Sequence, residues 1–444
     1  VTNADTGAIE FYSYSGSGFG VLGLASLGDV SIDNSGSIGG YAYGQSVGIF
    51  GQADQGDVSV DNSGTVTAIT GGNAAVGIFA RADYGTASVD NSGDIYASVD
   101  GINGFAGVAA YGIIARGEYA SVSNSGNIDV LGYDTAIGIA ANSYYGSAVT
   151  NTGGSISVAA LGNGTGIGAQ SAYGDVMVDN ASDLDVIGLY GSATGINAVA
   201  GGDASVTNSG SIYAGSLYGT SIGIYGYSVG GDVTIDNSGD LTAISYYGLA
   251  DGIFASGANV DVTNAGAIEV YGYTWAAGIE AQGDVSATVD NSGDITVDSA
   301  GFLQVQDYYG VIGYAPGAQA FGIYATGGEG GVDLTNSGTI SVDGGYVAGI
   351  EVQSSGDIGV SNSGDIVAGS GYNASYNSYN GYYYFYGTQV ATGINATSNG
   401  EGAHVGVTNS GDITAEGIFG ASGIAATSGG LGGTASVDNS GDIY

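Results

Sequence analysis

Apolar and polar residues alternate over short stretches of this chain, and the same arrangement returns many times along its length. In residues 57–62, Val58 and Val60 alternate with polar neighbours, which is the period-two pattern of a strand with one buried face. A Ser-Gly turn leads to a second short stretch at 66–68, and a third begins at Gly77. Each repeat therefore predicts three short strands separated by three bends.

An Asn ends the first strand of every repeat and stands two positions after a Val, Ile or Leu. Because an amide carries both a donor and an acceptor, we expect these side chains to point inward and to hydrogen-bond from repeat to repeat in a ladder. A ligand or a catalyst would be needed only once. The many copies of this Asn therefore indicate a structural role. The fifteen copies are Asn3, Asn34, Asn62, Asn91, Asn124, Asn151, Asn180, Asn208, Asn237, Asn264, Asn291, Asn336, Asn362, Asn409 and Asn439.

The third strand has its own marker, a Gly followed by Ile or Val. Three strands per repeat without helix signals indicate one rung of a single-chain parallel β-helix, right-handed by the usual twist of parallel crossovers. We therefore predict an all-β fold, a right-handed parallel β-helix (β-solenoid) of about 15 rungs, as one domain over residues 1–444. The marker glycines are Gly20, Gly48, Gly77, Gly112, Gly138, Gly166, Gly195, Gly223, Gly252, Gly278, Gly322, Gly349, Gly393 and Gly423.

Two intervals between marker asparagines are longer than the others, at 45 and 47 residues. The extra residues lie between the second and third strands, so we predict loop insertions at about 300–320 and 368–390 that leave the same side of the solenoid. Tyr among Ser, Gly and Asn is typical of adaptable binding loops. Two interpretations stay open: these rings bind a glycan or protein partner, or they cover the solenoid. The candidate partner-binding residues are Tyr372, Tyr376, Tyr379, Tyr382, Tyr383, Tyr384 and Tyr386.

The charge balance narrows the choice of partners. The 444 residues include 42 acidic and 2 basic side chains, for a net charge of -40. Such a chain is repelled by DNA, RNA and anionic lipid, so we exclude nucleic acid as a partner. No run of 18 apolar residues occurs, which predicts no membrane insertion. The sequence has no Cys and opens without a signal peptide, so we expect a mature product or an excised portion, stabilised by the repeat itself.

The repeated phrase resembles a known family. Residues 206–212 read Val-Thr-Asn-Ser-Gly-Ser-Ile, and residues 223–226 read Gly-Ile-Tyr-Gly. This combination resembles the β-strand-repeat passenger regions of bacterial autotransporter-type surface proteins, and the resemblance spans essentially the whole chain. It implies export across two membranes and an extracellular or cell-surface location, where the protein would serve as a shaft, an adhesin or a fibre.

Catalytic chemistry has few candidates in this sequence. The basic residues and the one histidine are Arg81, Arg116 and His404. Arg81 and Arg116 occupy equivalent places in adjacent repeats, with Asp83 and Glu118 two residues beyond, so we expect exposed ion pairs rather than an active site. His404 has no partner in the sequence pattern and is expected at the surface. We predict a protein that is not an enzyme; the alternative, a polysaccharide hydrolase or lyase, would need a carboxylate pair, and no pair stands out.

The residue before each marker Asn is expected to face outward and to stack in register. From Thr150 to Asp290 this position alternates between Thr and Asp, which dilutes like charge along the stack. Asp33, Asp61 and Asp90 break the alternation. One hypothesis is that they hold a divalent cation, for which calcium suits the oxygen ligands. The alternative is that salt screening and slightly raised pKa values suffice.

The two ends of the chain stand at the same phase of the repeat. The first three residues end at Asn3, and Val437 stands in the same relation to Asn439. The last rung of one copy could therefore stack on the first rung of the next, and such a heterologous contact yields a filament. We accordingly expect an extracellular structural β-solenoid that forms or decorates a surface fibre or surface layer. The alternative is a cell-surface adhesin that binds glycan or protein through its Tyr-rich loops.

Overall fold

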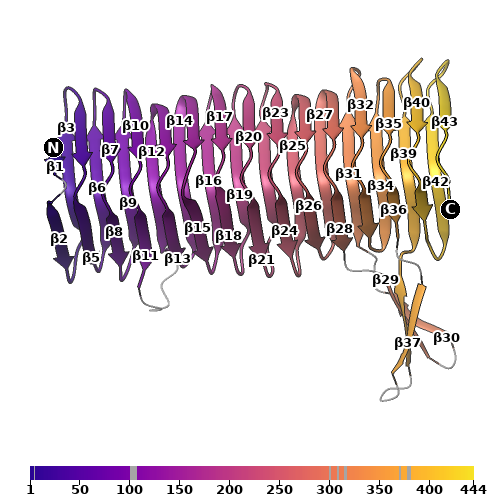
Figure 1. Ribbon diagram of the computed structural model, residues 1–444, viewed down its shortest axis with the longest axis horizontal. Helices are drawn as coiled ribbons and strands as arrows, with labels where there is room; N and C mark the ends of the chain where they lie inside the picture. Colours follow the sequence, from indigo (N-terminus) through magenta and orange to yellow (C-terminus); the bar gives the residue numbers. More distant parts are fainter. Residues whose placement is uncertain are drawn as a thin grey trace. The chain divides into compact units, whose positions relative to one another are not determined.

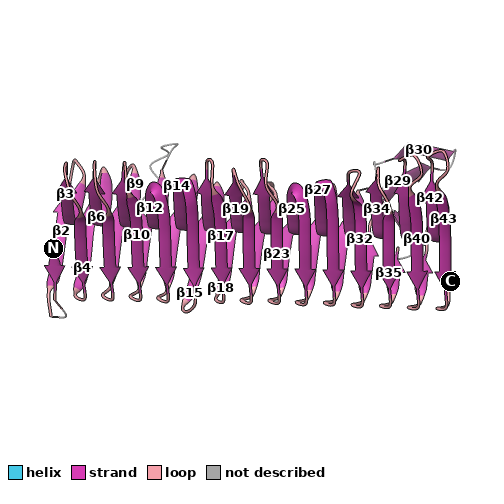
Figure 2. Ribbon diagram, turned by 90° about the horizontal axis from the view of Figure 1, so that it is seen from above, coloured by secondary structure: helices cyan, strands magenta, loops and turns pink. Residues whose placement is uncertain are grey.

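The structure consists of strands and turns. In the four strands within 302–314 and 372–387, the structure defines the backbone alone. The computed structural model describes residues 1–4, 6–100, 108–299, 302–307, 310–314, 318–369, 372–377 and 382–444. These residues contain no helix (Figure 2), and hence none that could cross a membrane. They divide into two compact units: unit 1 comprises Val1–Gly219 and Gly223–Ile235, and unit 2 comprises Thr220–Ile222 and Asp236–Tyr444.

Unit 1 repeats three strands per rung, and each strand pairs in parallel with its counterpart one rung along (Figure 1). The first strands, which end at a marker Asn, are β1 (Thr2–Asn3), β4 (Val30–Asn34), β7 (Val58–Asn62), β10 (Thr86–Asn91), β17 (Asp175–Asn180) and β20 (Ala204–Asn208). The second strands are β2 (Ala8–Ser13), β5 (Ser37–Ala42), β8 (Val66–Thr70), β11 (Ile95–Val99), β13 (Ile128–Gly132), β15 (Ser155–Ala160), β18 (Asp183–Gly188) and β21 (Ile212–Ser216). The third strands are β3 (Gly18–Ala25), β6 (Gln45–Ala53), β9 (Ala74–Ala82), β16 (Asn163–Ser171) and β19 (Ala193–Ala200). Two long strands join a third strand to the next first strand, β12 (Ala109–Asn124) and β14 (Thr135–Asn151).

Unit 2 has the same organisation. Its first strands are β32 (Gly331–Asn336), β35 (Ile358–Asn362), β40 (His404–Asn409) and β43 (Thr434–Asn439). Its second strands are β24 (Leu241–Ser245), β26 (Ile268–Gly272), β28 (Ile295–Ser299), β33 (Ile340–Asp343), β36 (Ile366–Ala368) and β41 (Ile413–Ala415). Its third strands are β31 (Gln319–Gly327), β34 (Tyr346–Ser354), β39 (Val390–Ser398) and β42 (Gly420–Ser428), and the joined strands are β25 (Leu249–Asn264) and β27 (Trp275–Asn291). Two strands take residues from both units, β22 (Ser221–Ser228) and β23 (Val233–Asn237).

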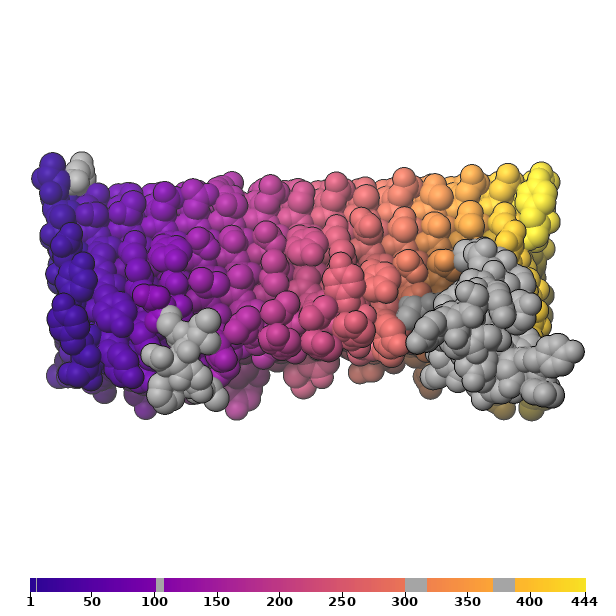
Figure 3. Space-filling model, turned by 90° about the horizontal axis from the view of Figure 1, so that it is seen from below, coloured from indigo at the N-terminus to yellow at the C-terminus, as the bar shows by residue number. Residues whose placement is uncertain are grey.

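Residues that alternate between apolar and polar in the sequence alternate between buried and exposed in the structure. Val58 and Val60 in β7 are fully buried, whereas Ser59 and Asp61 between and after them face solvent. Because the pairing is parallel and in register, each residue lies beside the equivalent residue of the next rung, and the rungs form adjacent bands in each unit (Figure 3). The all-β, parallel β-solenoid is thus confirmed. Its right-handed sense and its description as one domain stay predictions.

The predicted Asn ladder is confirmed. In unit 1, Nδ2 of Asn34 donates to Oδ1 of Asn62 at 2.6 Å and also to the carbonyl of Gly36 in its own turn at 3.0 Å. Bonds of this kind, 2.6–2.8 Å long, connect the asparagines from Asn3 to Asn208 in unit 1. The same ladder runs from Asn237 to Asn439 in unit 2. Most of these amides also donate to a carbonyl of their own turn, so they stabilise both the stacking of rungs and the bend.

The marker Gly of the third strand is required by close packing. A Cβ at Gly77 would lie 2.3 Å from Cγ2 of Ile95 and 2.6 Å from the carbonyl oxygen of Gly112. Both distances are too short for non-bonded atoms, so a side chain here would push the third strand away from the core. The strand can approach only because this position is Gly.

Many of the acidic residues also have a structural role. Oδ1 of Asp29 accepts the backbone N–H of Asp57 at 2.9 Å, and Oδ1 of Asp57 accepts that of Thr86 at 2.8 Å. In unit 2, Asp365 and Asp412 each accept an N–H from the next rung in the same way. These carboxylates satisfy turn amides that would otherwise lack a partner, so the acidic composition does not by itself indicate catalysis.

The two insertions are not loops, which corrects the expectation from the sequence. Each lies between a second and a third strand, as predicted, but their backbones pair with each other in one antiparallel sheet (Figure 1). Its strand order is β30-β29-β38-β37. The four strands are β29 (Phe302–Asp307), β30 (Gly310–Tyr314), β37 (Tyr372–Asn377) and β38 (Tyr382–Gly387).

Candidate functional site

The outward face of the third strands in unit 1 carries a row of hydrogen-bond donors. The position four residues after the marker Gly stacks in register from β6 to β16. Both basic residues of this strongly acidic chain lie in the row, flanked by amides that also carry N–H donors. The donor row consists of Gln52, Arg81, Arg116, Asn142 and Gln170.

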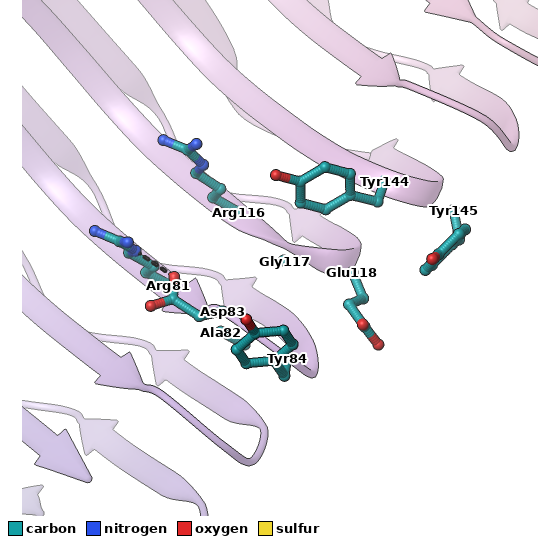
Figure 4. A pocket seen from close by; sticks show the side chains of 9 residues that line it. All are labelled: Arg81, Ala82, Asp83, Tyr84, Arg116, Gly117, Glu118, Tyr144 and Tyr145. Atoms are coloured by element: carbon teal, nitrogen blue, oxygen red, sulfur yellow. Dashed lines mark hydrogen bonds and ion pairs between the residues drawn. The ribbon is translucent and has the colours of Figure 1, made fainter. Parts of the chain in front are cut away.

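The two arginines differ in their ion pairing. Nε of Arg81 lies 2.7 Å from Oδ1 of Asp83, so the expected pair is confirmed there. The equivalent expectation for Arg116 and Glu118 is wrong: within the described chain Arg116 forms no ion pair, and the two side chains point in different directions (Figure 4).

A β-bulge explains the difference. The pairing of β12 with β14 shifts between Gly117 and Tyr119, and the N–H of Glu118 donates to the carbonyl of Gly85 at 2.9 Å. Tyr144 and Tyr145 of β14 stand opposite the single Glu118 of β12, and such a bulge twists the paired strands locally and changes where the side chains point. Glu118 therefore no longer stands beside Arg116, whose guanidinium is exposed.

A groove of about 400 Å³ lies next to the arginines. Three exposed tyrosines line it, with Tyr144 and Tyr145 each 52% exposed and their ring centroids 6.5 Å apart. We call it the arginine groove, and its lining consists of Arg81, Ala82, Asp83, Tyr84, Arg116, Gly117, Glu118, Tyr144 and Tyr145 (Figure 4). A guanidinium pairs bidentately with a carboxylate or sulfate, and Tyr rings supply flat apolar contact area. The groove is thus suited to a ligand with an acidic group on a ring.

The lining tyrosines were missed in the sequence although a signal existed. Tyr84 and Tyr144 each stand seven residues before a marker Asn, Asn91 and Asn151. Equivalent positions in nearby rungs lie side by side in a solenoid, so this shared offset places both rings at the same corner. The arginines could be aligned in the same way from their offset to the marker Gly.

The tyrosines predicted to contact a partner lie in the inserted sheet. Tyr372 and Tyr376 belong to β37, and four others belong to β38, where Tyr383 pairs with Tyr376 in the backbone register. Tyr379 lies outside the described residues. The structure brings these positions together on two neighbouring strands, and their role in partner binding stays a prediction.

The three consecutive aspartates stack as expected. Asp33 pairs with Asp61, and Asp61 with Asp90, in exact register along exposed positions. Within the described ranges, no group of three or more His, Asp or Glu side chains is placed to hold a metal ion. Calcium binding by this stack stays a prediction. His404 is exposed as expected, but it does have a partner, because its Nδ1 lies 2.7 Å from Oγ1 of Thr434.

A second cluster, in unit 2, was also missed. Asp251 and Glu280 are only 6% and 7% exposed, although the alternation pattern places both on the outward face. Burial, with the nearby Glu280 carboxyl, raises the pKa of Asp251 to about 8, and burial also raises the pKa of Glu280. The indole Nε1 of Trp275 donates to Oδ1 of Asp251 at 3.1 Å. Two features of the sequence could have indicated this cluster: an Asp directly before a marker Gly, and the one Trp of the sequence.

Comparison with known proteins adds no family to these observations. No protein-family model, no curated protein and no solved structure matches the chain.

Proposed function

We propose that this protein is an extracellular β-solenoid that binds acidic glycans in the arginine groove. One observation carries the proposal: the guanidinium of Arg116 is exposed and has no ion-pair partner in the described part of the chain, although the chain has a net charge of -40. An arginine in a chain with so many carboxylates would be expected to form an ion pair with one of them. The bulge at Glu118 instead keeps it free for an external anion.

The surroundings of Arg116 favour a sugar as the carrier of that anion. Arg81 lies beside Arg116 in the next rung, and its charge is offset by Asp83. The exposed rings of Tyr144 and Tyr145 border the same groove and can pack against the C–H face of a sugar. Its volume of about 400 Å³ is in the range of small-ligand sites. A uronic acid or sulfated sugar combines the required anionic group and ring, and a short one carries few enough charges for the direct contact with Arg116 to outweigh the salt-screened repulsion from the acidic chain.

The solenoid supplies rigidity to this site. The donor row is held by parallel backbone pairing in every rung, and the Asn ladder fixes the register beneath it. Such a scaffold holds the side chains in place before the ligand arrives, which reduces the ordering cost of binding. This supports a structural protein that displays a binding site. The end-to-end association of copies stays a prediction, to be tested by light scattering at high concentration.

The test is calorimetric titration of the protein with an oligouronate and with a neutral oligosaccharide of equal length. Arg116→Gln keeps hydrogen-bond donors like those of its neighbours Asn142 and Gln170 but removes the charge. We expect it to weaken oligouronate binding about 10- to 100-fold, the contribution of a charged hydrogen-bonded pair. Tyr144→Ala should weaken binding as well, whereas Tyr173→Ala, an exposed tyrosine of unit 1 outside the groove, should not.

Two results would contradict the proposal. Equal affinity for the neutral oligosaccharide would show that the anionic group is not recognised. Oligouronate binding that survives Arg116→Gln and is lost on deletion of 372–386 would place the site in the inserted sheet, as the sequence-based alternative predicts.

A further inference from the structure

The outward face of the third strands in unit 2 gathers aromatic rings. Trp275 on β27 and Phe321 and Tyr324 on β31 have ring centroids 4.9–5.8 Å apart. Their planes are tilted by 45°, 52° and 84° to one another, so they form a concave corner rather than a flat surface. The row of Phe321 continues in the next rung with the small residue Ala348, which lines the space beside the rings.

A groove of about 340 Å³ follows from this arrangement. We call it the aromatic groove; the three rings line it or border it together with Tyr346, Glu351 and Gln353. Glu351 stands one rung beyond Tyr324 in the same outward row, and Glu280 stands one rung before it. Rings and carboxylates therefore alternate along the strand-stacking direction.

The carboxylates of this region have no cationic partner. The two arginines of the sequence lie in unit 1, at 81 and 116, and the sequence has no Lys in unit 2. Glu351 is held by amides alone: Nδ2 of Asn395 donates to both of its oxygens at 3.0 and 2.9 Å, and Nε2 of Gln353 donates to Oε1 at 3.1 Å. Burial raises the pKa values of Glu351, Glu280 and Asp251. Buried acids without counter-charge cost stability, and a cluster of acids with raised pKa values beside a groove is a candidate functional site.

The buried acids also orient the tryptophan. The indole N–H of Trp275 is bonded to Asp251, which fixes the orientation of the ring beside Phe321 and Tyr324. The carboxylate of Glu351, which lines the same groove, adds when ionised to the negative electrostatic potential of the ring faces. A site of this kind attracts a cation and disfavours an anion.

We propose that the aromatic groove binds an organic ammonium ion, with the cation held against the rings of Trp275, Phe321 and Tyr324 and facing the carboxylate of Glu351. Three tilted ring faces suit a compact tetrahedral group better than an extended sugar, which packs on a single flat face. The net charge of -40 adds long-range attraction for any cation. The site is independent of the arginine groove, and each can fail without the other.

The experiment uses choline as the probe and its uncharged isostere 3,3-dimethylbutan-1-ol as the matched ligand. Trp275 is the one tryptophan of the sequence, so intrinsic fluorescence reports directly on the groove. We expect choline to change the emission in a saturable way and to bind at least about tenfold more tightly than the isostere, as expected for cation–π attraction in a desolvated site.

Variants separate this role from a structural one. Glu351→Gln keeps the size of the side chain and should weaken choline binding about tenfold with little effect on the isostere. Tyr324→Leu should also weaken choline binding, whereas Tyr246→Leu, an exposed tyrosine of unit 2 outside the groove, should leave it unchanged. Circular dichroism checks that each variant is folded. If Tyr324→Leu does not fold, the test rests on Glu351→Gln.

The pH dependence gives a further readout. The titratable groups around the cation are Asp251 on β25, Glu280 on β27, Tyr324 on β31, and Tyr346 and Glu351 on β34, while β39 contributes the neutral Asn395. Choline keeps its charge at every pH, so its affinity should rise several-fold between pH 6 and pH 9 as Asp251, whose pKa is raised to about 8, loses its proton. Equal binding of choline and the isostere, or no saturable response at millimolar choline, would overturn the proposal.

Discussion

Replacing Asp251 by Asn tests whether a buried, unpaired carboxyl lowers the stability of unit 2. The side chain is 6% exposed, and burial and Glu280 raise its pKa from 3.8 to about 8. Asn has nearly the same shape, and its amide oxygen can still accept the indole N–H of Trp275. The variant thus removes the titration while it keeps the packing and the hydrogen bond.

The sign follows from proton binding. Between about pH 4 and pH 8 the folded protein holds a proton on Asp251 that the unfolded chain has lost, so the free energy of unfolding falls as pH rises through this window and levels off above it. Each pH unit within the window corresponds to about 1.4 kcal/mol, so from pH 5 to pH 9 the wild type should lose up to about 4 kcal/mol relative to Asp251→Asn. Relaxation around the Asp251–Glu280 pair makes this an upper limit.

The assay is denaturant unfolding at pH 5 and pH 9, followed by the fluorescence of Trp275. Asp251→Asn should have a stability close to that of the wild type at pH 5 and should be clearly more stable at pH 9. The matched control is Asp261→Asn on the same strand β25, where the carboxyl is exposed. If the wild type and Asp251→Asn respond identically to pH, Asp251 is ionised and stabilised in the folded state, and the reasoning is wrong.

Three further predictions concern the solenoid itself. Asn180→Ala should destabilise unit 1 by about 2–5 kcal/mol in denaturant unfolding, because it leaves buried partners of the ladder unsatisfied. Gly77→Ala should cost at least about 2 kcal/mol, whereas Gly39→Ala, whose Cβ would meet nothing within 4 Å, should have little effect on the same measurement. Calcium should raise the melting temperature of the wild type and not that of Asp61→Thr; if calcium has no effect and Asp61→Thr melts higher, the stack is unrelieved repulsion.

The fold could be predicted from the sequence because its determinants are local and repeated. Alternation such as that of Val58 and Val60 defines a strand with one buried face, and the marker Asn and Gly define where each rung bends and where it packs closely. Because the pattern recurs in every rung, a rung that is ambiguous by itself can be assigned from the others. The pairing of Arg81 with Asp83 could be predicted for the same reason, since it joins residues two positions apart on one strand.

The tertiary structure decided the features that depend on contacts between distant residues. Spacing alone assigned Glu118 to Arg116, but the bulge that separates them arises from the mismatch between two neighbouring rungs. The two insertions were predicted as loops, but each contains a pair of antiparallel strands, and β29 pairs with β38, about eighty residues away, to join the two pairs into one sheet. Asp251 stands at an outward position and is buried nonetheless, and it accepts a hydrogen bond from the indole of Trp275 in the next rung. Local alternation thus determines which way a side chain points, whereas its burial and its partners depend on which rungs become neighbours.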